Sequence, residues 1–292
     1  MSRRTFETWC RGWVAIVAVG AVGCGVEQGS EEPGEVGDTA RELIANNGLN
    51  LNGLNLNGLS SNSFLNWIQG DLTLRTEVMK YMTACAVPAG ETRTYTDPLT
   101  LRTYTWSGVL GLAPSWAGGA PATLEEQQVV SACMAAHANK YGLHVSLSLV
   151  GLNAVGTPLP TTSQEVADYT LREACFFGNL FDGSTGTFSG NDGLSLNSTQ
   201  SSPRVCGLPG AANSSQCAPL VYVGSCSTYC TWDANRSFYT SCTYNGVTYR
   251  PLTTRMKPSA LATCGDGVCQ ATEKCGTGTT PTNCAADCGT CP

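Results

Sequence analysis

The sequence predicts an α+β protein, with a disulfide-stabilised main domain over residues 63–258 and a small cysteine-rich knot over residues 264–292. Two patterns predict the class: helical apolar stripes dominate the middle of the chain, and strand-like segments dominate its C-terminal third. Charged residues make up 13% of the chain and hydrophobic residues 42%, which excludes a typical disordered protein. We therefore expect three helices and a set of antiparallel strands in the main domain.

Residues 1–23 have the pattern of a secretory signal peptide. Three arginines precede an apolar run that ends at Val22, and small residues follow it. This run is too short to span about 30 Å of hydrocarbon. Residues 21–24, Ala-Val-Gly-Cys, resemble a bacterial lipobox, whose cysteine is acylated and becomes the mature N-terminus. We therefore expect Cys24 to carry lipid and anchor the protein to a membrane. An ordinary cleaved signal with an incidental cysteine is the alternative.

Residues 24–62 are expected to form the lipidated anchor and a tether. Residues 25–38 are acidic and rich in small residues, so they cannot bury enough apolar surface to fold. Residues 46–59 then repeat a Leu-Asn-Leu-Asn-Gly unit. A few copies of such a unit cannot bury their own faces. We interpret the repeat as a low-complexity linker, and a turn of a repeat-type β-coil is the alternative.

Helical spacing predicts helices over residues 72–85, 124–141 and 163–175. Asp71 is placed to cap the first, and a Thr-x-x-Glu capping box precedes each of the other two. Each helix would carry one cysteine on its apolar face, which suits a cysteine that staples a helix to the core. These are Cys85, Cys133 and Cys175.

Strand signals lie between and after these helices. Residues 103–110 are rich in β-branched and aromatic side chains, residues 143–149 alternate apolar and polar, and residues 220–223 form a short apolar run. Residues 237–250 contain Asn245-Gly246, a strong signal for a two-residue hairpin turn.

The cysteines predict an oxidising compartment. When Cys10 of the leader and Cys24 are set aside, two even groups of cysteines remain, eight in residues 85–242 and six in residues 264–291. In an exported protein they indicate up to seven disulfides, whose pairing the sequence does not reveal. Structural zinc is the weaker alternative, because no histidine lies near the C-terminal cysteines or the Cys226-x3-Cys230 pair. The disulfide candidates are Cys85, Cys133, Cys175, Cys206, Cys217, Cys226, Cys230, Cys242, Cys264, Cys269, Cys275, Cys284, Cys288 and Cys291.

Signatures of catalysis are weak. The chain has no nucleophile elbow, no zinc-protease motif and no phosphate loop. His137 or His144 could act as a base, although His137 lies on an apolar helical stripe that suits a packed core residue. A glycosidase needs two facing acids, and no spacing singles out a pair. The acids present in the main domain include Glu173, Asp182, Asp192 and Asp233.

The last 29 residues combine six cysteines with many glycines and threonines. So short a piece must be held by cross-links or by a metal. Its Cys-Gly-Asp-Gly-Val-Cys start and Asp-Cys-Gly-Thr-Cys end resemble short modules at the ends of many secreted bacterial proteins. The acids at the positions that recur in such modules suit calcium, and plain surface acids are the alternative. They are Asp266, Glu273 and Asp287.

Together, the lipobox, the repeat and the C-terminal module resemble uncharacterised surface lipoproteins of the myxobacterial kind. Residues 130–139 and 176–180 are also similar to proteins of that group. The resemblance implies a cell-envelope location and no particular activity. A formal charge of -6 with cations spread singly excludes nucleic acid as an expected partner.

We therefore expect a non-enzymatic lipoprotein, exposed outside the cytoplasm at the outer membrane or cell surface, that binds a surface protein or a polysaccharide. Its cofactors are none, or calcium in the C-terminal module. The alternative is a secreted hydrolase acting on glycans or peptides with His137 or a carboxylate pair.

Overall fold

The computed structural model describes residues 62–138, 145–182, 186–196, 220–270, 273–281 and 283–291. All of these residues belong to one compact unit. The signal peptide, the lipidation candidate Cys24 and nearly all of the tether lie outside the described residues. So do the disulfide candidates Cys206 and Cys217, and His144.

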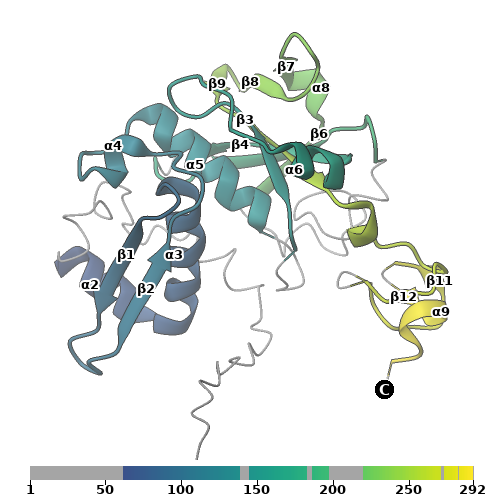
Figure 1. Ribbon diagram of the computed structural model, residues 1–292, viewed down its shortest axis with the longest axis horizontal. Helices are drawn as coiled ribbons and strands as arrows, with labels where there is room; N and C mark the ends of the chain where they lie inside the picture. Colours follow the sequence, from purple (N-terminus) through teal and green to yellow (C-terminus); the bar gives the residue numbers. More distant parts are fainter. Residues whose placement is uncertain are drawn as a thin grey trace, which may run out of the picture. The chain divides into compact units, whose positions relative to one another are not determined.

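The α+β prediction is confirmed, because the described chain combines helices with antiparallel and mixed sheets (Figure 1). Within the described ranges, no helix is long and apolar enough to cross a membrane. The helices are α2 (Asn62–Gly70), α3 (Leu72–Ala86), α4 (Pro114–Ala117), α5 (Leu124–His137), α6 (Ser163–Asp168), α8 (Cys226–Tyr229) and α9 (Ala285–Cys288).

The starts of α3 and α5 follow the predicted caps. The Asp71 carboxylate accepts a hydrogen bond from the Leu74 N–H at 3.0 Å. The Thr123 hydroxyl accepts from the Glu126 N–H at 3.2 Å, and the Glu126 carboxylate accepts from the Thr123 N–H at 2.9 Å. This reciprocal capping box satisfies two N–H groups that a helix start leaves without partners.

The strands of the described residues pair in one large and three small sheets. The large sheet has the order β3-β10-β4-β5-β6; its neighbours are antiparallel except β5 and β6, which are parallel. The hairpin β1-β2, the sheet β7-β8-β9 and the pair β11-β12 make up the rest. The strands are β1 (Thr92–Thr96), β2 (Thr103–Ser107), β3 (Ser148–Gly151), β4 (Leu171–Asn179), β5 (Gly186–Asn191), β6 (Leu220–Ser225), β7 (Cys230–Trp232), β8 (Tyr239–Tyr244), β9 (Val247–Tyr249), β10 (Leu252–Met256), β11 (Thr279–Thr280) and β12 (Asn283–Cys284).

The third predicted helix is wrong beyond its first turns. Thr162 caps α6 as expected, but α6 ends at Asp168 and the chain enters β4. Eight of the nine β4 residues are buried, since β4 is flanked by β10 and β5 and both of its faces are covered. A strand buried on both faces has a continuous apolar run, which periodicity alone does not separate from a helix. Cys175 therefore lies on a strand.

Two other predicted elements differ from the structure in their limits. The second helix ends at His137, before the expected stop at Gly142. The strand expected over residues 143–149 begins only at Ser148, as β3, and all four of its residues are buried. The predicted hairpin is confirmed: Asn245 and Gly246 have φ of 51° and 78°, the left-handed pair that a tight hairpin turn needs.

A β-bulge in β4 decides which side chains share a face. Arg255 of β10 lies opposite Arg172, and Thr253 lies opposite Cys175, so two residues of β4 span one residue of β10. Because directly opposed residues point to the same face, Arg172 and Cys175 face the same side of the sheet. Without the bulge, two residues three apart would face opposite sides.

The two faces of the large sheet border different cores. One contains Ala174 and Phe176 of β4 with residues of α3 and α5. The other contains Cys175 and Phe177 with aromatic residues and cysteines of β7, β8 and β9. Phe176 and Phe177, which follow Cys175, thus lie on opposite faces of β4 and contribute one side chain to each core.

The prediction of disulfides is confirmed for the described cysteines, and each described pair joins cysteines of the same group. In the main body, Cys85–Cys133 joins α3 to α5, Cys175–Cys226 joins β4 to α8, and Cys230–Cys242 joins β7 to β8. In the C-terminal module the six cysteines pair first with fourth, second with fifth and third with sixth, as Cys264–Cys284, Cys269–Cys288 and Cys275–Cys291.

Candidate functional site

A group of charged and aromatic side chains lies where β4, β5 and β10 meet the β7-β8 turn. We call it the arginine cluster, and it consists of Arg172, Asp192, Trp232, Tyr239 and Arg255. Nε and Nη2 of Arg172 donate to Oδ2 of Asp192 at 3.2 Å and 2.9 Å. The Arg172 guanidinium carbon lies 4.5 Å from the centre of the Trp232 ring, and that ring stacks on Tyr239 with centroids 3.7 Å apart.

The interior of the arginine cluster is closed to water at Asp192 and Tyr239, which are 3% and 0% exposed. Burial raises the pKa of Asp192, and the Arg172 guanidinium offsets this only in part. Burial also raises the pKa of Tyr239, with a further contribution from the Asp192 charge. Tyr239 therefore keeps its hydroxyl proton at neutral pH.

Arg255 differs from Arg172 in its partners. Its Nη2 donates to the carbonyl of Ser237 at 3.0 Å, and its buried Nε has no hydrogen-bond partner among the described residues. Burial lowers the pKa of Arg255, and the Arg172 charge opposite it lowers it further. Like charges directly opposite each other on neighbouring strands destabilise a sheet. The cluster therefore holds two cations side by side, of which only Arg172 is bonded directly to a described carboxylate.

The other predicted carboxylates are used by the fold or lie apart. Asp233 accepts hydrogen bonds from the N–H groups of the β7-β8 turn, including that of Phe238 at 2.9 Å. Glu173 is fully buried and accepts from the Thr254 hydroxyl at 2.9 Å. Asp182 is exposed on a loop. In the described chain, Asp192 is the one of these four that bonds to the Arg172 guanidinium.

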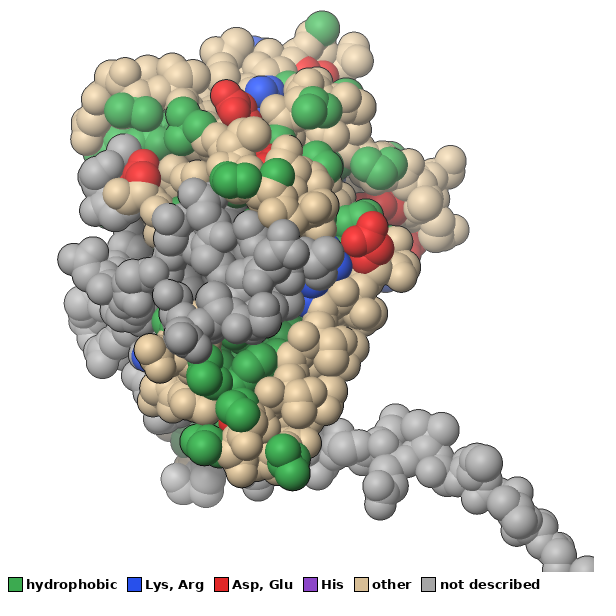
Figure 2. All heavy atoms as spheres, turned by 90° about the vertical axis from the view of Figure 1, so that its left-hand side faces the viewer, with side chains coloured by type: hydrophobic (Ala, Val, Ile, Leu, Met, Phe, Trp, Pro, Cys, Tyr) green, Lys and Arg blue, Asp and Glu red, His purple; other side chains and the backbone are tan. Residues whose placement is uncertain are grey.

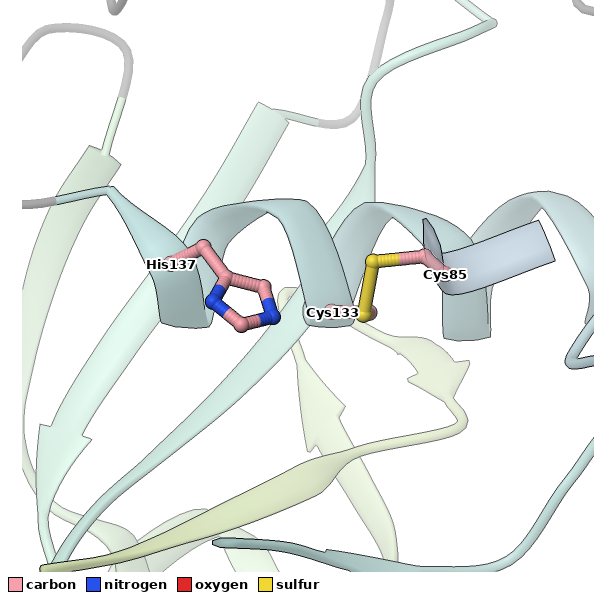
Figure 3. Close-up of side chains that lie close together, drawn as sticks. All are labelled: Cys85, Cys133 and His137. Carbon is pink, nitrogen blue, oxygen red and sulfur yellow. A yellow bond between two sulfur atoms is a disulfide. The ribbon is translucent and has the colours of Figure 1, made fainter. Parts of the chain in front are cut away.

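His137 lies on the last turn of α5, beside a disulfide. Figure 3 shows its ring next to the bond between Cys85 and Cys133. Its ring centroid is 5.3 Å from that of Tyr81, with the planes tilted by 33°. Ligand atoms of His137 and the two cysteines lie within 4.8 Å of one another, but sulfur in a disulfide offers no thiolate to a metal. The geometry is that of a packed side chain.

The three acids predicted to hold calcium accept hydrogen bonds inside the C-terminal module. Asp287 accepts from the N–H groups of Gly265, Asp266 and Gly267. Asp266 accepts from the Val268 N–H at 2.9 Å and from the Gln270 side-chain amide at 2.7 Å. Carboxylates that organise a loop in this way need no cation to do so.

Glu273 is the exception among these acids. Its Oε2 accepts from the Gln270 N–H at 3.2 Å, but its buried Oε1 has no partner in the described chain. Burial raises the pKa of Glu273, and the charges of Asp287 and Asp266 raise it further. Among the described residues, no metal-sized group contains two of the three acids. Calcium binding by these three acids therefore stays a prediction.

The hairpin β1-β2 presents an uncharged surface, which we call the hairpin face. On each strand every second residue is exposed, and the exposed residues lie opposite one another. Two of the pairs join their hydroxyls, Thr94 to Thr105 at 3.4 Å and Thr96 to Thr103 at 3.0 Å. The exposed residues are Thr92, Thr94, Thr96, Thr103, Thr105 and Ser107.

The turn of this hairpin displays two leucines. Leu99 and Leu101 are each 78% exposed, and Leu101 has a φ of 58°, which costs a leucine about 1–2 kcal/mol. The buried Asp97 holds the turn, because its carboxylate accepts from the Leu99 N–H at 3.0 Å and the Thr100 hydroxyl at 2.6 Å. Figure 2, which views the molecule from the side where β1 and β2 lie in Figure 1, shows hydrophobic groups on a surface with few charges.

Sequence reasoning missed the arginine cluster. It noted Asp192 among the acids of the main domain, but not Arg172 and Arg255. Both arginines lie in segments that become largely buried strands. Only the strand register shows that they are neighbours.

Comparison of this chain with protein-family models, with curated proteins and with solved structures finds no match.

Proposed function

We propose that this protein is a non-enzymatic lipoprotein of the cell envelope, anchored through lipid on Cys24 and exposed outside the cytoplasm, where it binds a surface protein or a polysaccharide. The observation that carries the proposal is the set of six disulfides among the described cysteines, each within one of the two even groups. Disulfides persist in oxidising compartments and are rare in a reducing cytoplasm. The leader and the lipobox-like residues 21–24 agree with such a location.

The surroundings of the candidate catalytic groups support a binding role over hydrolysis. Asp192 is bonded to Arg172, Glu173 is buried against Thr254, and Asp233 holds a turn. A glycosidase needs one acid and one base or nucleophile facing a common cleft. The hairpin face and the two exposed leucines of the adjoining turn, Leu99 and Leu101, offer a surface for a partner.

Anchoring is tested by Cys24→Ala, with Cys10→Ala as the matched control in the same leader. The expected result is that wild type and Cys10→Ala fractionate with membranes and incorporate labelled fatty acid, while Cys24→Ala does neither. Membrane association of Cys24→Ala equal to that of the wild type would refute the lipid anchor.

The non-enzymatic role is tested on the purified, oxidised protein. It is expected to show no turnover of a panel of glycans and peptides. Turnover that His137→Ala or Asp192→Asn abolishes, with the fold retained by circular dichroism, would establish the hydrolase alternative instead.

A further inference from the structure

We propose that the arginine cluster is a binding site for an oxyanion, a carboxylate or a phosphate group, held by Arg255 and the Tyr239 hydroxyl beside the Arg172–Asp192 pair. The site would admit either a free anion or an acidic group of an extracellular polymer. The proposal does not depend on lipid anchoring.

Two buried donors without partners carry the proposal. The Tyr239 hydroxyl is on a side chain that is 0% exposed, and it has no hydrogen-bond partner in the described chain. The same holds for Nε of Arg255. A buried donor left unsatisfied costs about 1–3 kcal/mol, so native structures seldom keep two in one region. Both groups offer hydrogens, and an acceptor satisfies them.

The charge of the region selects an anion as that acceptor. Arg172 and Arg255 lie opposite each other on neighbouring strands, and Asp192 is bonded to Arg172. The charges of Asp192, Glu165 and Asp233 act on Arg255, that of Asp192 most strongly, but none of the three forms an ion pair with it among the described residues. Within the part of the chain that the structure describes, Arg255 is therefore a cation without a direct counter-ion.

The shape of the donors favours an oxyanion over a spherical ion. A guanidinium presents its N–H groups as a planar fork that matches the oxygens of carboxylate and phosphate. Arg172 already uses such a pair of nitrogens on Asp192. Arg255 has its Nε free, with Nη2 on the Ser237 carbonyl.

An anion can reach the site from the side of Arg255. Arg255 is partly exposed, whereas Arg172 is 9% exposed and Asp192 is 3% exposed. Arg236 on the adjoining β7-β8 turn is exposed, and its carbonyl accepts from Nη1 of Arg172. Because Asp192 and Tyr239 are buried, the bound group would be largely dehydrated.

The test measures thermal unfolding and calorimetric binding of the purified full chain, with disulfides formed, in acetate, phosphate and chloride at equal ionic strength. Acetate or phosphate is expected to raise the melting temperature above its value in chloride. Arg102→Gln, which removes the same charge from the exposed hairpin, should keep this response. Arg255→Gln should weaken binding about tenfold or more, because it removes a charged hydrogen bond.

Tyr239→Phe gives a second, independent readout. It keeps the ring that stacks on Trp232 and removes only the hydroxyl. Without anion, the variant should melt at or above the wild-type temperature, because an unsatisfied buried group is gone. With anion, it should gain less than the wild type. Polygalacturonate, compared with neutral dextran, then distinguishes a polymer-borne carboxylate from free anion, since a polymer ligand would act at a lower carboxylate concentration than acetate.

Three results would overturn the site. The first is a wild type whose melting temperature is the same in acetate, phosphate and chloride. The second is an equal response of Arg255→Gln and the wild type. The third is an equal loss in Arg102→Gln and Arg255→Gln, which would indicate general charge screening.

Discussion

Removal of two disulfides of the main body should destabilise the protein to different, calculable extents. Cys85–Cys133 closes a loop with a sequence separation of 48 and Cys230–Cys242 one of 12. No other cysteine lies inside either loop, so cross-links elsewhere shorten neither. The chain-entropy relation gives losses of about 4 kcal/mol for the first and about 3 kcal/mol for the second.

The comparison is well matched because each double alanine variant deletes the same atoms. All four cysteines are buried, with exposures between 0% and 8%, so the packing losses are similar and the difference of about 1 kcal/mol comes from loop length. Urea unfolding of the oxidised variants, followed by tryptophan fluorescence, measures the free energy of unfolding. Equal losses, or a larger loss for Cys230→Ala/Cys242→Ala, would refute the entropic argument.

Three further predictions concern a cap, a carboxylate and the C-terminal module. Thr123→Ala should cost about 1 kcal/mol in urea unfolding because it removes a helix cap, whereas Thr105→Ala on the exposed hairpin should cost less than about 0.5 kcal/mol; equal costs would contradict this. The Thr100 hydroxyl and a backbone N–H hold the pKa of Asp97 below its ordinary value, so its contribution to stability is present above about pH 4 and is lost as the pH falls through the folded-state pKa. Asp97→Asn should reduce the fall in melting temperature at acid pH. An unchanged fall would be evidence against this contribution of Asp97. Calcium should raise the melting temperature, with reversal by chelator and loss of the effect in Glu273→Gln; no shift in the wild type would mean that the knot is held by disulfides alone.

Local features were predicted well because their partners lie within a few residues. The Asp71 cap and the capping box at Thr123 each depend on hydrogen bonds across three residues. The Asn245-Gly246 turn depends on two left-handed residues. Such signals are complete in the sequence, and the folded chain uses them as expected.

The third predicted helix failed for the opposite reason. Residues 171–175 carry helical spacing, but their backbone groups pair with β10 and β5. Gly190 shows how far this arrangement depends on distant residues. A Cβ there would lie 2.9 Å from the Gly224 carbonyl oxygen and 3.1 Å from Cys226 Sγ, so the crossing of the Cys175–Cys226 bond leaves no space for a side chain.

By itself, the sequence determined the α+β class, the helix starts, the hairpin turn and the presence of disulfides. Each depends on composition or on contacts between near neighbours. The tertiary structure alone decided which cysteines pair, that Cys175 lies on a strand, and that Arg172 and Arg255 are neighbours. The two arginines are far apart in the chain, and a bulge in β4 sets the face on which they meet. Strand register depends on the whole sheet, and no local pattern of residues encodes it.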